Sequence, residues 1–120
     1  MSLGDARLPI SPVTAAKIPA AVDRVVQRLY RVFEARSVVV FGSYARGDQT
    51  DRSDIDLLVV LPDDERLEEA TRRRSQIVAG LFPAVDLVLT TPREMVEARG
   101  ERAAFLRSVL EHGVVLPATA

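Results

Sequence analysis

Residues suited to binding a phosphate group follow a short apolar run near the middle of the sequence. Gly42 ends the run 37–41, and glycine lets the backbone approach a ligand closely because it has no Cβ. Ser43 is suited to capping a short helix that Gly47 would end. The free N–H groups at a helix N-terminus favour an anion, and Arg46 adds a charged donor one turn along. The stretch therefore predicts a phosphate-binding turn.

Two carboxylates open the next apolar run. Asp54 and Asp56 stand at the start of 55–61, so in a strand both side chains leave the same face, roughly 7 Å apart. Neighbouring carboxylates at the edge of a core are costly unless a cation neutralises them. Magnesium prefers one or two carboxylates together with substrate phosphates. A phosphate-binding turn followed by paired carboxylates therefore predicts phosphoryl chemistry of the kind that uses two metal ions.

Together the two stretches resemble a known family signature. The string Gly-Ser-Tyr-Ala-Arg-Gly at 42–47, followed by Ser-Asp-Ile-Asp-Leu-Leu-Val at 53–59, is similar to that of the minimal nucleotidyltransferases. These form a small bacterial branch of the DNA polymerase beta-like nucleotidyltransferase superfamily, and its members are often the antitoxin paired with a HEPN-domain toxin. The alternative interpretation is a turn followed by a solvated acidic loop.

The resemblance implies a role for each residue of the signature. Two Mg²⁺ ions would be held by Asp54 and Asp56. The β- and γ-phosphates of ATP would be bound by Gly42 and Ser43, with Arg46 assisting.

A third carboxylate lies in a later apolar run. Asp86 has apolar neighbours in 84–90, and a buried, unpaired Asp requires a metal ion or a strong hydrogen-bond partner. In the resembling family, a third acidic residue on a following strand completes the metal triad, and Asp86 occupies the matching place. Its implied roles are ligand of the catalytic metal and general base for the incoming hydroxyl. The alternative is an Asp that points to solvent from a half-exposed strand.

The composition is that of a soluble globular protein. Of 120 residues, 48% are hydrophobic and 28% charged, and the net charge of −1 argues against strong non-specific binding of nucleic acid through the whole surface. A nuclease that uses the same metals is disfavoured because nothing in the sequence resembles a nucleic-acid groove. The absence of cysteine excludes disulfides, thiolate metal sites and cysteine nucleophiles. No apolar stretch has the length of a membrane span and the N-terminus has no signal-peptide layout, so we expect a cytoplasmic protein.

Alternating helices and strands are predicted to position these residues. Residues 1–17 are predicted to be irregular and 18–117 to form a single nucleotidyltransferase domain. The fold class is α+β, a small mixed sheet with helices packed mainly on one face. Thr91 is expected to cap a helix, with Glu94 closing a capping box. The predicted strands are 37–41, 55–61, 84–90 and 114–116, and the predicted helices are 19–35, 43–46, 64–81, one from 92, and 101–112.

A run of three arginines, 72–74, lies in the predicted helix 64–81. One interpretation is a solvated face balanced by Glu65, Glu68 and Glu69. The other is a contact with a partner or with a nucleotide phosphate.

The predicted activity is transfer of AMP from ATP to a hydroxyl acceptor, with pyrophosphate leaving. Larger relatives carry a further domain for the acceptor, and 120 residues leave no room for one, so we expect another protein or a second copy in a homodimer to supply it. This favours an antitoxin that modifies a tyrosine of a HEPN-domain toxin. Two alternatives are an enzyme acting on a small molecule such as an antibiotic, and a non-catalytic antitoxin that acts by binding.

Overall fold

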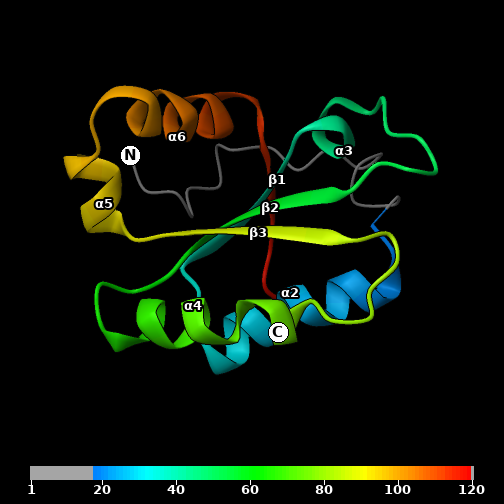
Figure 1. The fold of residues 1–120 in the computed structure, drawn as a ribbon, viewed down its shortest axis with the longest axis horizontal. Helices are drawn as coiled ribbons and strands as arrows, with labels where there is room; N and C mark the ends of the chain where they lie inside the picture. Colours follow the sequence, from blue (N-terminus) through cyan, green and yellow to red (C-terminus); the bar gives the residue numbers. More distant parts are fainter. Residues whose placement is uncertain (1–17, 120) are drawn as a thin grey trace.

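A four-stranded mixed sheet forms the centre of the protein (Figure 1). The computed structural model describes residues 18–119, so the predicted irregular segment 1–17 lies outside the described residues. The strands are β1 (Ser37–Phe41), β2 (Ile55–Val60), β3 (Val85–Thr90) and β4 (Val114–Leu116), in the order β3-β2-β1-β4. The predicted mixed α+β fold is confirmed.

Strand direction decides which loops meet. β1 runs antiparallel to β2 and to β4, whereas β2 and β3 are parallel. The last residue of β1, Phe41, therefore pairs with Asp56 near the start of β2, and Asp56 pairs with Asp86 near the start of β3. We call this edge of the sheet the carboxylate end. The opposite end holds the start of β1 and the last residues of β2 and β3.

The larger core lies between one face of the sheet and two helices, α2 (Ala20–Val32) and α4 (Glu65–Ile77) (Figure 1). Both helices present apolar positions at helical spacing, and alternate strand residues complete the core because strand side chains alternate between faces. These strand residues are Val38, Val40, Ile55, Leu57, Val59, Val85, Leu87, Leu89, Val114 and Leu116.

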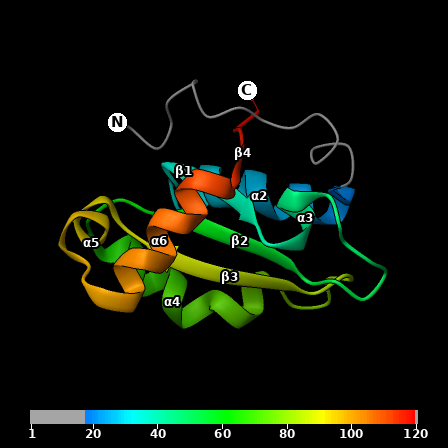
Figure 2. The same cartoon turned by 90° about the horizontal axis from the view of Figure 1, so that it is seen from above.

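A smaller core covers part of the other face. The helices α5 (Pro92–Glu97) and α6 (Gly100–His112) lie there, and Figure 2 shows α6 crossing the sheet. The prediction that the helices pack mainly on one face is therefore wrong, because two helices cover each face. Leu106 and Val109 of α6 pack on Val39 and Leu58. The short helix α3 (Ser43–Arg46) follows β1 at the carboxylate end. Within residues 18–119, no helix has the length and apolar character needed to cross a membrane.

Element boundaries differ from the prediction mainly at helix ends. α2 ends at Val32 rather than at 35, and α4 ends at Ile77 rather than at 81. After α4 the chain forms a turn in which Gly80 has a φ of 75°, a conformation that stops a helix. Thr91 caps α5 as predicted, because its hydroxyl accepts a hydrogen bond from the Glu94 N–H at 3.2 Å.

Candidate active site

The predicted phosphate-binding turn and the Asp56 carboxylate meet at a single glycine. Gly42 follows β1 with φ 73° and ψ −149°. A Cβ placed on it would lie 2.5 Å from Asp56 Oδ2, far inside van der Waals contact. Any side chain at position 42 would therefore displace the Asp56 carboxylate. The spacing of the motif predicted both groups, but their contact follows from the pairing of β1 with β2 and has no signal in the sequence.

Helix α3 places the predicted phosphate ligands at the carboxylate end. Gly42 itself is the N-cap, since its carbonyl accepts the N–H groups of Ala45 and Arg46, each at 3.1 Å. The prediction that Ser43 caps this helix is therefore wrong, and Ser43 is the first helical residue. Gly47 ends α3 in the left-handed conformation, as predicted. The exposed Arg46 guanidinium pairs with Asp48 at 3.2 Å.

The structure brings the three predicted carboxylates to the same edge of the sheet. Asp56 stands opposite Asp86 in the β2–β3 register, and both belong to the face that α6 covers farther along. Partial burial raises the pKa of the Asp56 carboxyl, and the negative charges of Asp86 and Asp54 raise it further, whereas Arg46 opposes the shift. The charges of three other predicted site residues therefore act on the Asp56 carboxyl.

Asp86 differs from its prediction in one respect. Its side chain is exposed, while its neighbours Val85 and Leu87 are buried in the larger core. The argument that a buried Asp must have a partner is therefore wrong here, because strand alternation turns this residue to the opposite, less covered face. The exposed position leaves the carboxylate accessible to a substrate.

A compact turn that the sequence analysis missed leads into Asp54. The Ser53 hydroxyl accepts the Thr50 N–H at 2.9 Å, and the Ser53 N–H donates to the Thr50 carbonyl at 3.1 Å. Two residues after Ser53, the Ile55 N–H donates to the Ala84 carbonyl at 2.9 Å, which fixes the segment beside the start of β3. Small polar residues before the two carboxylates were the available signal for this turn.

The donor chemistry of the site suits a hard cation. Asp54, Asp56 and Asp86 offer only oxygen ligands, and their mutual repulsion is the effect that a cation would relieve. In residues 18–119, no three His, Cys, Asp or Glu side chains are arranged around one point as ligands of a single ion. Asp54 and Asp86 are exposed, so their side chains are free to rotate toward an ion.

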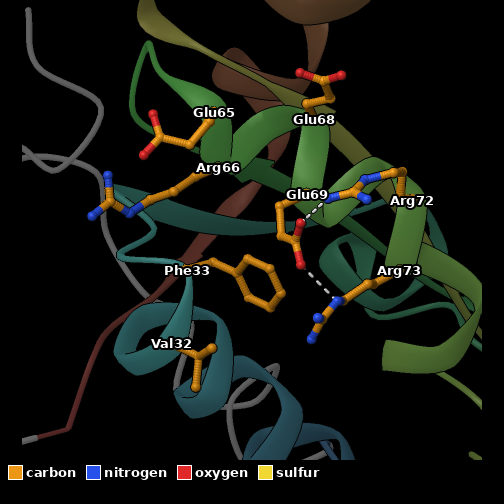
Figure 3. A pocket seen from close by; sticks show the side chains of 8 residues that line it. All are labelled: Val32, Phe33, Glu65, Arg66, Glu68, Glu69, Arg72 and Arg73. Atoms are coloured by element: carbon orange, nitrogen blue, oxygen red, sulfur yellow. Dashed lines mark hydrogen bonds and ion pairs between the residues drawn. The ribbon is translucent and has the colours of Figure 1, made fainter.

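A separate hollow lies between α2 and α4, on the other face of the sheet (Figure 3). It measures about 540 Å³, and Glu69 of α4 pairs there with Arg72 and with Arg73, the latter at 2.7 Å. These pairs favour a solvated, charge-balanced face for the two arginines over a phosphate contact. The hollow is lined by Val32, Phe33, Glu65, Arg66, Glu68, Glu69, Arg72 and Arg73.

Comparisons with known proteins bear on the reaction class. Two proteins of Methanocaldococcus jannaschii named "putative protein adenylyltransferase" are 56% identical over 27 residues, which is 22% of this chain and 28% and 27% of theirs. A third of the same name and organism is 37% identical over 46 residues, 38% of this chain and 47% of that protein. The chain thus matches less than half the length of these curated relatives.

A solved structure of similar fold was found. A crystal structure from Sulfolobus solfataricus described as a "putative nucleotidyltransferase" aligns with 85% of this chain and 81% of its own, with a TM-score of 0.58 and 23% identity. A toxin–antitoxin structure with AMP-PNP aligns with a TM-score of 0.48 and 20% identity over 81% of this chain and 73% of its own. The family described as "Nucleotidyltransferase domain" matches residues 21–118. Because that match covers most of the sequence, the chain belongs to the nucleotidyltransferase domain family.

Proposed function

We propose that this protein transfers AMP from ATP to a hydroxyl group of a partner protein. The close approach of Gly42 to Asp56 carries the proposal, because it places the proposed phosphate-binding turn beside the carboxylates. Membership of the nucleotidyltransferase domain family gives the reaction class. The shared segment with proteins named "putative protein adenylyltransferase" supports a protein acceptor.

The residues have distinct roles. Asp54 and Asp56 hold two Mg²⁺ ions, and Asp86 is a ligand of the catalytic one. When bound, the metal supplies positive charge that stabilises the reacting phosphate oxygens. The Gly42 backbone and the Ser43 hydroxyl bind the β- and γ-phosphates, and the Arg46 guanidinium adds charge beside them.

The reaction is a single displacement at the α-phosphorus of ATP. The acceptor oxygen forms a bond to this phosphorus, and the bond from the phosphorus to the oxygen bridging the α- and β-phosphates breaks. Pyrophosphate is the leaving group, and Gly42 and Ser43 bind it as it departs. The acceptor hydroxyl gives its proton to the Asp86 carboxylate, which is exposed and therefore able to return it to water.

The acceptor that we propose is a tyrosine of a HEPN-domain toxin, so that the protein acts as an antitoxin in the cytoplasm. The support is the resemblance of 42–47 and 53–59 to the minimal nucleotidyltransferases.

The test is label transfer from α-phosphate-labelled ATP. The protein is incubated with Mg²⁺ and labelled ATP, alone and with host lysate, and proteins are then separated from small molecules. We expect label on one protein band, which chelation of Mg²⁺ and the Asp54→Asn/Asp56→Asn double variant both abolish. Asp51→Asn is the matched control, since it removes an exposed carboxylate from the loop before Asp54.

The other outcomes point to the alternatives. Label on a small molecule would replace the protein acceptor by a small one. No label, with full protection of cells from a toxin by the double variant, would show that the protein acts by binding alone.

A further inference from the structure

The connection between α4 and β3 lies beside the candidate active site. The Ala84 carbonyl accepts the Ile55 N–H at 2.9 Å, and two residues later Asp86 stands opposite Asp56. Figure 1 shows this connection at the same end of the sheet as α3. We call residues 78–84 the 78–84 patch, and its last residue, Ala84, lies next to the carboxylates on the β3 side.

The 78–84 patch is apolar and partly open to solvent, since Val78 and Leu81 are half-buried against the larger core. Its sequence, Val-Ala-Gly-Leu-Phe-Pro-Ala, has no charged side chain and no side-chain hydrogen-bond donor or acceptor. Phe82 is 86% exposed, and Ala79 and Ala84 are exposed as well. A phenylalanine this exposed is unusual in a folded protein, because its side chain gains the most from leaving water.

Phe82 is also the one aromatic ring of this chain that is free to receive a ligand. The two tyrosines and four phenylalanines all lie in the described part. Phe33 and Tyr44 are buried, and the Tyr30 hydroxyl is bonded to the backbone of Val38 and Leu116. The other two are in the smaller core, where Phe41 and Phe105 pack edge to face with ring centroids 5.5 Å apart.

We propose that the 78–84 patch is the docking surface for the protein acceptor and that Phe82 is its main apolar contact. The inference rests on the proposed function and adds the direction from which the acceptor arrives. In phosphoryl transfer, the attacking and leaving oxygens lie roughly in line through the phosphorus. The strand order places Gly42 and Ser43 after β1, and Asp86 on β3, with β2 between them.

This strand order places the leaving pyrophosphate and the attacking hydroxyl over different strands. Pyrophosphate leaves over β1, so the attacking hydroxyl approaches over β3, where Asp86 accepts its proton. Within residues 18–119, β3 is an edge strand, so that no other described strand pairs with its outer side. The 78–84 patch is the surface that an acceptor meets there.

The chemistry of the patch selects a protein over a polar small molecule. A sugar or an aminoglycoside-like acceptor needs hydrogen-bonding side chains, and the patch has none. A protein segment that carries a hydroxyl residue flanked by apolar side chains can bury those side chains on Phe82. Exposed aromatic residues are typical anchors of such interfaces.

The experiment uses the acceptor protein identified by label transfer, purified, with wild-type protein and three variants. Phe82→Ala is expected to raise the KM for the acceptor about tenfold while KM for ATP and kcat stay unchanged. Val96→Ala is the matched control, because Val96 is 78% exposed on α5 at the opposite end of the sheet. Phe82→Trp is expected to keep a low KM, since tryptophan retains a large apolar ring.

Fluorescence gives a second readout. The chain contains no tryptophan, so Trp at position 82 is the sole indole, and its emission is expected to shift on addition of the acceptor but not of MgATP. An unchanged acceptor KM in Phe82→Ala would overturn the inference while the proposed function stands. If MgATP quenched the emission of Phe82→Trp and the KM for ATP rose in Phe82→Ala, residue 82 would contact the nucleobase instead of the acceptor. Failure of the wild-type protein to label any protein would overturn both.

Discussion

Replacing Gly42 by alanine tests whether the phosphate-binding turn and the carboxylates act as one site. The added Cβ would lie 2.5 Å from Asp56 Oδ2. Ordinary contact begins near 3.4 Å, so the carboxylate must move by about 1 Å. Gly42 also has φ 73° and ψ −149°, a combination that is essentially restricted to glycine.

The expected loss of stability follows from the backbone. A side chain forced into this conformation costs about 1–3 kcal/mol, which for a domain of this size lowers the melting temperature by roughly 4–12 °C. The displaced Asp56 carboxylate changes ligand binding independently of this loss. We therefore expect Gly42→Ala to lower the affinity for MgATP at least tenfold at a temperature where the variant is folded.

Gly47→Ala is the matched control. Gly47 ends the same short helix, has φ 80°, and has no atom within 4 Å of the place where a Cβ would stand. Its replacement costs about 1–2 kcal/mol of backbone strain and leaves Asp56 untouched. Titration calorimetry with MgATP and thermal unfolding of both variants separate the two effects. Equal MgATP affinity in the two variants would refute the coupling of the turn to the carboxylate.

Three further changes act on stability rather than on the site. Tyr30→Phe leaves two backbone groups without their shared hydroxyl, so urea unfolding should show a loss of about 1–3 kcal/mol with unchanged MgATP binding. The Arg102 guanidinium lowers the pKa of the Glu94 carboxyl, so this pair stabilises the protein above the ordinary Glu pKa of about 4.3, and the stabilisation disappears as pH falls through the lowered value. In Glu94→Gln, the free energy of unfolding should fall less steeply at acid pH. The difference from wild type should be less than about 1 kcal/mol, since the pair is partly exposed. Arg73→Ala, which removes an exposed partner of Glu69, should cost less than about 1 kcal/mol and leave label transfer intact, whereas lost transfer would indicate a phosphate contact.

The sequence was sufficient to predict the strands and the mixed sheet, because each strand is a short apolar run bounded by turn residues. It also predicted the segments that meet at the carboxylate end, since Gly42, Asp54 and Asp56 belong to one continuous signature. These features depend on residues that are close in the sequence, so the sequence pattern predicts them. Thr91 is a further case, as its hydroxyl caps the helix that its position predicts.

Features that depend on long-range packing were not accessible in the same way. Glu94 was expected to close a capping box, but its carboxylate instead accepts the Thr90 hydroxyl and the Arg102 guanidinium of α6. The exposure of Asp86 depends on which sheet face α6 leaves uncovered. In the sequence, Phe82 is one apolar residue among several. Only the structure shows that its side chain is exposed, in the connection that leads to Asp86.

The mixture of strand directions is what assembles the site. Since β1 is antiparallel to β2, the turn after β1 meets the start of β2. Since β3 is parallel to β2, the third carboxylate and the 78–84 patch before it arrive at that same edge. An antiparallel β3 would instead carry Asp86 to the end where Glu94 and Arg102 join α5 to α6. Variants at the carboxylate end should therefore change binding and transfer, and variants at the opposite end should change stability with the reaction intact.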